Sequence, residues 1–179
     1  MKKIVISAIA LLSVPALYAQ PQLNADNIDD VISAMTLEEK ATLCVGGARA
    51  SIVEGVTSGL IKEVPGAAGN TRPIPRLGIP NTVLADGPAG LRISPAREGT
   101  TQTFYCTGFP VGTLLASSWD TALVERVTGA MGNEVLEYGV DVLLAPGVNI
   151  HRNPLCGRNF EYFSEDPVLS GNMGAAYIK

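Results

Sequence analysis

Two short apolar runs, separated by a long connection, constrain the fold of this 179-residue chain more than any other feature. Residues 81–86 end in an Asp followed by Gly-Pro, and residues 140–145 are followed by Pro-Gly, so a turn stops each run. The connection contains a polar loop at residues 94–108 and a helical pattern that Asp120 caps and Gly139 ends. Near-continuous apolar strands are typical of parallel sheets, in which both faces are buried. The order strand, helix, strand therefore predicts an α/β fold.

Local signals predict further helices. Residues 28–35 carry apolar side chains at helical spacing, and Thr36 with Glu39 forms a capping box that opens a second short helix. Residues 48–76 are rich in Gly, Pro and Ala, and we expect long loops there with a short helix near residues 58–63. An Asp-Pro pair at residues 166–167 begins the last helix, with Asp as the cap and Pro at the first helical position.

The first residues have the pattern of a targeting signal. Two lysines precede an apolar run at residues 4–14 that is too short to span a bilayer, and Ala19 offers a small residue before a cleavage site. The alternative is a buried N-terminal helix. We therefore predict a signal peptide at residues 1–19, followed by a linker and first helix at residues 20–35. The mature protein is expected to be exported to the periplasm or the medium, with no membrane partner after cleavage.

Composition and charge exclude several classes of function. A hydrophobic fraction of 46% and a charged fraction of 17% are ordinary for a protein with a core. The net charge of −4, without a basic patch, argues against nucleic acid or anionic lipid as a partner. Three cysteines and one histidine do not match a zinc site, and we expect the cysteines to be small, buried apolar side chains. The sequence contains no phosphate-binding glycine loop, dinucleotide fingerprint or nucleophile elbow.

Candidate functional residues follow the two predicted strands, because working groups in βα barrels stand at the carboxyl ends of strands. Asp86 ends the first strand, and its carboxylate can accept hydrogen bonds from two hydroxyl groups of one ligand. The alternative is that Asp86 only caps the turn before Gly87. Arg92 and Arg158 offer planar, multi-donor guanidinium groups for hydroxyl or carboxylate oxygens. Their alternative is structural pairing with nearby carboxylates.

Asp86 and Glu161 would lie near each other if the two strands are neighbours. Hydrolysis of a glycosidic bond needs two carboxyl groups, so this pair is one candidate for catalysis. In the other interpretation Asp86 holds a substrate while Glu161 orients an arginine, and spacing does not decide between them. His151 follows the second strand and is either a base or substrate donor, or a hydrogen-bonded structural residue.

Eight segments carry a resemblance to a known family through their motifs and their order. They lie at residues 64–69, 75–80, 84–92, 109–110, 115–119, 139–147, 149–161 and 164–167. Together they are similar to the start of bacterial family 3 glycoside hydrolases of the β-glucosidase type, over about residues 35–179. One Asp-Gly-Pro would be weak evidence, whereas this many segments in the same order are specific.

The resemblance implies a fold and a mechanism. The first domain of this family is a (β/α)8 TIM-like barrel, of which residues 36–179 would be an incomplete N-terminal part, and an α/β sandwich domain follows. The reaction is retaining, exo-acting hydrolysis of terminal β-linked sugars, with no metal and no organic cofactor. By match to the family's motifs, Asp86, Arg92 and Arg158 would bind the carbohydrate substrate. Glu161 and His151 would have supporting roles, which removes Asp86 and Glu161 as the catalytic pair.

The chain departs from the family pattern in its catalytic groups. The family's Lys-His pair and the Ser-Asp-Trp-type segment that carries the nucleophile have no counterpart, and residues 118–120 have the order Ser-Trp-Asp. We therefore expect the nucleophilic Asp and the acid/base Glu beyond residue 179, and the chain alone to be inactive. Two other interpretations stay open: a secreted, non-catalytic carbohydrate-binding or accessory module, and a fragment that does not fold alone.

Overall fold

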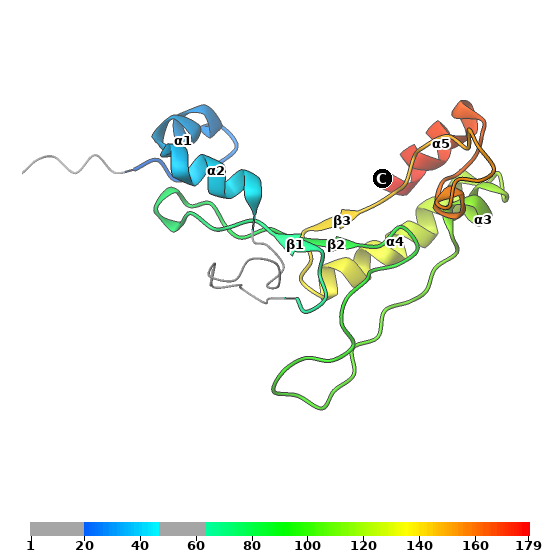
Figure 1. The fold of residues 1–179 in the computed structure, drawn as a ribbon, viewed down its shortest axis with the longest axis horizontal. Helices are drawn as coiled ribbons and strands as arrows, with labels where there is room; N and C mark the ends of the chain where they lie inside the picture. Colours follow the sequence, from blue (N-terminus) through cyan, green and yellow to red (C-terminus); the bar gives the residue numbers. More distant parts are fainter. Residues whose placement is uncertain (1–19, 47–63) are drawn as a thin grey trace, which may run out of the picture.

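The computed structural model describes residues 20–46 and 64–179, and it consists of two helical groups joined by a small sheet (Figure 1). One group contains α1 and α2. The other contains α3 and α5, at the opposite end of the strands, and α4, which runs from there back alongside the sheet. The predicted signal peptide and the predicted short helix near residues 58–63 lie outside the described residues.

The N-terminal helices form where the sequence predicts them. Helix α1 spans Ile28–Ala34 and helix α2 spans Leu37–Val45. The backbone N–H of Thr36 donates to Glu39 Oε2 at 2.8 Å, and the N–H of Glu39 donates to Thr36 Oγ1 at 3.1 Å. These reciprocal bonds confirm the capping box, which satisfies two donors that a helix start leaves without partners.

A short 3₁₀ helix, η1 (Pro75–Leu77), packs under these two helices. Val31 and Met35 share a small apolar cluster with Ile74 and Leu77. Arg76 of η1 then reaches back to the Glu39 carboxylate and donates to the Ala34 carbonyl at 3.0 Å. This arginine therefore ties η1 to the end of α1 and the start of α2.

The sheet has three short strands in the order β1-β2-β3. Strand β1 (Gly69–Asn70) is antiparallel to β2 (Val83–Asp86), and β2 is parallel to β3 (Val142–Leu144). The parallel pairing of β2 and β3 confirms the predicted βα alternation. Strand β1 was predicted to be loop, because a two-residue Gly-Asn strand is too short to produce a period-2 pattern.

The predicted burial of both strand faces is wrong for β3. Val83 and Ala85 of β2 are buried, whereas Val142 and Leu144 of β3 remain 40% and 45% exposed. Strand β3 lies at the edge of the sheet, and the elements of residues 20–46 and 64–179 cover these two side chains only in part. An apolar sequence therefore predicted the strand correctly but not what surrounds it.

Three helices build the main apolar core beside the strands: α3 (Gly112–Ala116), α4 (Thr121–Glu137) and α5 (Pro167–Ile178). The predicted caps are confirmed, because the Asp120 carboxylate accepts from the N–H of Leu123 at 2.9 Å and Asp166 accepts from Val168 at 2.8 Å. The shared core is built from buried side chains of these helices and of the loop before α5: Leu115, Ala116, Val124, Met131, Phe163, Met173, Ala176 and Tyr177.

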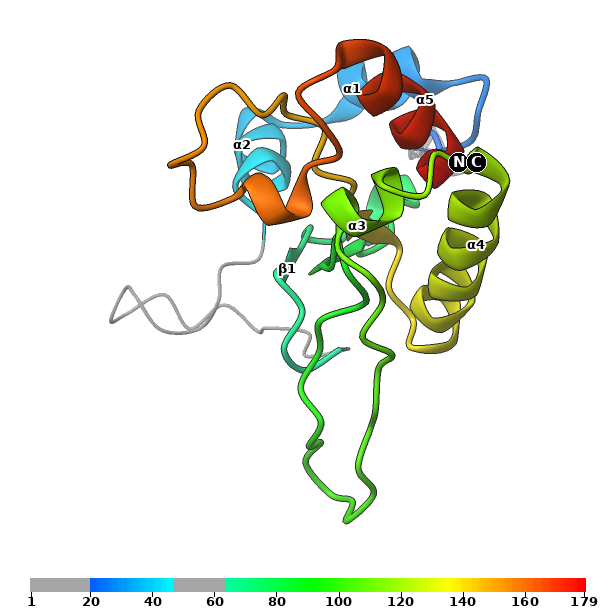
Figure 2. The ribbon, with the colours of Figure 1, turned by 90° about the vertical axis from the view of Figure 1, so that its right-hand side faces the viewer.

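The connection between β2 and α3 is a long loop that projects from the body of the protein in both views (Figures 1 and 2). Its return limb is fixed to α4, because Thr107 donates through its N–H, at 3.0 Å, and through its hydroxyl to the Glu134 carboxylate. The Arg97 guanidinium lies 4.1 Å from the centre of the Phe104 ring, which holds the two limbs together. The predicted loop at residues 94–108 is thus confirmed.

The cysteines differ from the prediction. Cys44 and Cys156 are exposed, and Cys106 is partly buried, so burial of all three was wrong. Both exposed thiols lie near the ends of helices or in loops, where hydrophobic composition does not determine burial. Among the described helices, none combines the length and the apolar character that crossing a bilayer requires.

Candidate functional site

Asp86 is the last residue of β2 and pairs in register with Leu144 of β3. Its carbonyl accepts a 2.9 Å hydrogen bond from the N–H of Arg92, which closes the intervening loop. Arg92 Nη1 lies 3.7 Å from Asp86 Oδ2, and these side chains are 78% and 50% exposed. Water screens an ion pair of this kind, so both groups keep hydrogen-bonding capacity for a ligand.

The loop after Asp86 is tight because two glycines allow close backbone approaches. A Cβ on Gly87 would lie 2.3 Å from the Gly90 carbonyl oxygen. Gly90 has φ +121°, and a Cβ there would lie 2.2 Å from the Thr107 carbonyl oxygen. The N–H of Phe109 also donates to the Ala89 carbonyl at 2.9 Å. The carboxylate of Asp86 is therefore presented by a loop with little room to move.

The second loop brings a buried carboxylate and an exposed guanidinium to the same edge. The 3₁₀ helix η2 (Asn159–Glu161) places the Glu161 side chain so that it accepts a hydrogen bond from Arg158 Nε. The Thr113 hydroxyl of α3 lies 2.8 Å from the carbonyls of Asn159 and of Tyr162, which fixes η2 against α3. Helix α3 therefore acts as the support for this loop.

Electrostatics couple the two loops. The hydrogen bond and charge of Glu161 raise the pKa of Arg158, and the Asp86 carboxylate adds a smaller increase. Arg158 is 71% exposed, and its guanidinium carbon lies 5.9 Å from the centre of the Tyr162 ring. Arg158 is thus a permanently charged donor group, hydrogen-bonded to Glu161 and close to the Tyr162 ring, and the negative charge of Asp86 stabilises its charge further.

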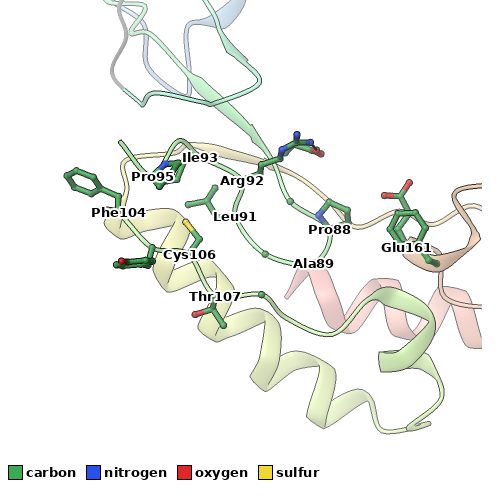
Figure 3. A pocket seen from close by; sticks show the side chains of 16 residues that line it. Pro88, Ala89, Leu91, Arg92, Ile93, Pro95, Phe104, Cys106, Thr107 and Glu161 are labelled. Atoms are coloured by element: carbon green, nitrogen blue, oxygen red, sulfur yellow. Dashed lines mark ion pairs between the residues drawn. The ribbon is translucent and has the colours of Figure 1, made fainter. Parts of the chain in front are cut away.

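A cavity of about 550 Å³ lies between the loop after β2 and the loop that carries Glu161. Asp86, Arg92 and Glu161 line it together with the Gly87–Gly90 turn and the return limb of the long loop (Figure 3). In that view the Arg92 and Glu161 side chains lie on either side of Pro88, and Leu91 points toward Cys106. Two carboxylates and a guanidinium around one cavity can bind a ligand rich in hydroxyl groups, because each can form charge-assisted hydrogen bonds.

The predicted site residues are distributed over two cavities. Asp86, Arg92 and Glu161 meet in the first, and Arg158 joins them through Glu161, although it is not among the lining residues. His151 lines a separate cavity of about 280 Å³ with Trp119. Its backbone N–H donates to the Ser164 carbonyl at 3.1 Å, and its Nε2 is buried with no hydrogen-bond partner in the described part of the chain.

Several lining residues were missing from the sequence prediction. Phe104, Tyr105, Cys106 and Thr107 reach the cavity from the return limb of the long loop, and Phe160 precedes Glu161. No motif marks the return limb, because its position depends on the long-range contact between Thr107 and Glu134. Phe160 adjoins the predicted Glu161, and its place beside a strand-end loop was a usable signal.

Metal ligands do not cluster in the residues that the structure describes. Within residues 20–46 and 64–179, no group of three or more His, Cys, Asp or Glu side chains could hold a metal ion.

Comparisons with known proteins agree on one family. Residues 81–179, more than half of the chain, match the glycosyl hydrolase family 3 N-terminal domain. The thermostable β-glucosidase B of Acetivibrio thermocellus is 46% identical over 160 residues, which is 87% of this chain and 18% of that protein. The exo-α-(1→6)-L-arabinopyranosidase of Bifidobacterium longum is 42% identical over 152 residues, covering 83% of this chain and 18% of that protein.

Solved structures give the same result. The structure of β-glucosidase 3B from Thermotoga neapolitana in complex with α-D-glucose is similar with a TM-score of 0.74 and 54% identity. The match covers 86% of this chain and 21% of that one, so the chain spans about a fifth of the length of these relatives. The match to the family's domain, supported by close relatives and by the shared fold, shows that this chain belongs to glycosyl hydrolase family 3.

Proposed function

We propose that this chain is the N-terminal segment of a retaining, exo-acting β-glycosidase of the β-glucosidase type, which hydrolyses terminal β-linked sugars in carbohydrate catabolism. One observation carries the proposal. Asp86, Arg92 and Glu161 line one cavity at the carboxyl ends of two parallel strands, and Glu161 holds Arg158 beside them. Membership of the family and the β-glucosidase relatives supply the reaction class.

The proposed role of this site is to grip the terminal sugar. The Asp86 carboxylate accepts hydrogen bonds from two neighbouring hydroxyl groups, while Arg92 and Arg158 donate to hydroxyl oxygens. Half of the Asp86 side chain is exposed, so a sugar can replace its bound water without moving the backbone. Glu161 orients Arg158, and His151, in the neighbouring cavity, has a supporting role. No metal or organic cofactor takes part in this proposal.

The fold proposal is that β2 and β3 are the first parallel strands of a (β/α)8 TIM-like barrel. The exposed apolar side chains of Val142 and Leu144, on an edge strand, support it because a neighbouring strand and its helix would cover them. In this arrangement residues 36–179 are a partial barrel domain, preceded by the linker and first helix at residues 20–35. Residues 1–19 act as a signal peptide that directs the protein to the periplasm or the medium.

The chain contributes binding groups and not the bond-breaking ones. A nucleophilic carboxylate and an acid/base carboxyl are both needed for retaining hydrolysis. In this proposal the Asp86–Glu161 pair does not fill these roles, as the resemblance to the family implies, and the hydrogen bond from Arg158 to Glu161 supports an orienting role for Glu161. In this proposal the nucleophile and the acid/base are supplied from outside residues 1–179, and we expect residues 1–179 alone not to hydrolyse glycosides.

The test is Asp86→Ala in the complete gene product, assayed with an aryl β-glucoside. We expect kcat/KM to fall at least about 100-fold, which corresponds to ~3 kcal/mol of lost transition-state binding. Asp29→Ala, which removes an exposed carboxylate on α1, is the matched control and should leave kcat/KM within about twofold. Near-wild-type kinetics of Asp86→Ala would overturn the proposal.

Two further measurements distinguish between possible substrates and between an enzyme and a binding module. An aryl α-L-arabinopyranoside, the class of sugar named for the Bifidobacterium longum relative, should be a poorer substrate than the β-glucoside. Glucose binding that depends on Asp86, in a complete gene product without turnover, would instead support the non-catalytic carbohydrate-binding module.

A further inference from the structure

We propose that Tyr177 is a positioning residue for the sugar-binding carboxylate of Asp86, because its hydroxyl holds the loop that follows β2. This inference rests on the proposed function of Asp86. The Tyr177 hydroxyl donates to the Pro88 carbonyl at 3.2 Å, across 89 residues of sequence. Pro88 lies two residues after Asp86, so helix α5 is joined directly to the base of the site.

Tyr177 is well placed to act as a fixed anchor. It lies in the last turn of α5, only 9% exposed, and packs in the core shared by α3, α4 and α5. Its ring meets the Phe163 ring edge-on, with centroids 6.3 Å apart. A side chain packed in this way keeps one rotamer, so the hydroxyl oxygen has a defined position.

The hydroxyl has two neighbours and one hydrogen to give. Met131 Sδ lies 3.0 Å away and the Pro88 carbonyl oxygen 3.2 Å away. A thioether is a weak acceptor and a carbonyl a strong one, so the hydrogen belongs to Pro88. Burial raises the pKa of Tyr177 to about 12, which keeps the phenol protonated, and therefore a donor, across the range in which glycosidases work.

The anchor reaches Asp86 through a loop that does not bend easily. The N–H of Gly90 donates to the Gly87 carbonyl at 3.2 Å, and the N–H of Arg92 donates to the Asp86 carbonyl at 2.9 Å. Gly87 and Gly90 already meet other backbone atoms as closely as a glycine allows. A shift of Pro88 is therefore passed to Asp86 and Arg92 instead of being absorbed between them.

The variant that isolates this role is Tyr177→Phe in the complete gene product, because it keeps the ring in the core and removes only the hydroxyl. We expect KM for the aryl β-glucoside and the inhibition constant of glucose to rise about 5- to 10-fold, the worth of one hydrogen bond. We expect kcat to stay within about twofold, because Asp86 holds substrate and transition state alike.

Ser170→Ala is the matched control, because it removes a buried hydroxyl from the same helix. The Ser170 hydroxyl donates to the Ser164 carbonyl, also at 3.2 Å, and neither residue lines the cavity of Asp86. A comparable change in Tm with unchanged KM is expected for this variant. Equal effects of Ser170→Ala and Tyr177→Phe on KM would overturn the positioning role.

A double-mutant cycle separates positioning from stability. In the Asp86→Ala background, Tyr177→Phe should cause a much smaller rise in KM, because the carboxylate that Tyr177 positions is gone and only Arg92 is still affected. Additive effects would overturn the inference. Hydrogen exchange of the Arg92 amide should be faster in Tyr177→Phe but not in Ser170→Ala, which reports the loop without reference to activity.

The same variants distinguish failure of the inference from failure of the proposed function. If Asp86→Ala keeps wild-type kinetics, the sugar-binding function of this site is wrong and the positioning role is overturned with it. If Asp86→Ala is impaired but Tyr177→Phe leaves the glucose inhibition constant and Arg92 exchange unchanged, only the role of Tyr177 is overturned.

Discussion

Glu161 and Arg158 form a pair in which the buried carboxylate holds the exposed guanidinium: the side chains are 9% and 71% exposed, respectively. The carboxylate accepts from Arg158 Nε, which leaves the terminal nitrogens of the guanidinium for a ligand. The buried position of Glu161 is supported by α3, where a Cβ on Gly112 would lie 2.4 Å from the Glu161 carbonyl oxygen. The exposed partner is thus oriented by the buried one.

Replacing Glu161 by Gln should weaken sugar binding without unfolding the protein. Gln keeps the shape but removes the negative charge of the acceptor, so the hydrogen bond from Arg158 loses its ion-pair attraction and Arg158 is held less firmly. We expect KM and the glucose inhibition constant of the complete gene product to rise about 10-fold, measured with an aryl β-glucoside. The exposed neighbour Glu165, changed to Gln, should leave both constants unchanged. An unaltered KM in Glu161→Gln would refute the orienting role.

Gly90→Ala should be strongly destabilising. The added Cβ would meet the Thr107 carbonyl oxygen at 2.2 Å, and φ +121° is itself unfavourable for Ala. Gly99→Ala is the control for strain alone, because Gly99 has φ +81° and nothing lies within 4 Å of its Cβ position. We expect a loss of ~1 kcal/mol for Gly99→Ala and ~3 kcal/mol or more for Gly90→Ala, compared by denaturant unfolding. Equal losses would show that the close approach does not matter.

The Glu39–Arg76 pair should make the N-terminal helices sensitive to acid. Hydrogen bonding to Arg76, and then the hydrogen bond from the Thr36 backbone, lower the pKa of Glu39 from 4.5 to about 2. A lowered pKa in the folded state means that the contribution to stability is complete above pH 4.5 and is lost as the pH falls toward 2. Titration of the Glu39 carboxyl carbon by NMR, assigned with Glu39→Gln, should give this low pKa. In Arg76→Leu the pKa should return toward 4.5, and an unchanged value would contradict the ion-pair explanation.

The three thiols should react at different rates with iodoacetamide. Burial, and then the negative charge of Glu134, raise the pKa of Cys106, so its reactive thiolate is scarce near neutral pH. Cys44 and Cys156 are exposed. Peptide mapping after brief alkylation should therefore find Cys44 and Cys156 modified before Cys106. Glu134→Gln should accelerate Cys106, both by removing a negative charge and by loosening Thr107.

Local hydrogen bonds explain why the helix starts were predictable. The capping box at Thr36 and the caps at Asp120 and Asp166 each join atoms within three residues, so the sequence contains all the information needed. The exposure of Leu144 was not predictable, because it depends on which elements stand beside β3. Helix α3 was also missed, since Gly112–Ala116 is too short to produce a periodic pattern.

The residues of the candidate site also divide into those that local sequence patterns predict and those that depend on long-range contacts. Asp86 and Arg92 were identified because they follow one strand, and Glu161 lies three residues from its partner Arg158. Thr107 was not predicted, because it reaches the cavity through a contact with Glu134, 27 residues away, and no local sequence pattern indicates that contact. The anchoring of Pro88 by Tyr177 spans 89 residues and required the packed helices to be seen.

The long separation between Tyr177 and Pro88 has a consequence for how the protein is made. On the ribosome, Pro88, in the loop that follows the acidic end of β2, is synthesised 89 residues before the phenol that anchors it. The growing chain therefore exposes the Asp86 carboxylate well before Tyr177 can fix its position. Closing so large a loop also costs conformational entropy, which is lost before the stabilising contacts form. Ligand affinity should consequently arise late in biosynthesis, as a property of the assembled helices and not of the strand that bears the acid.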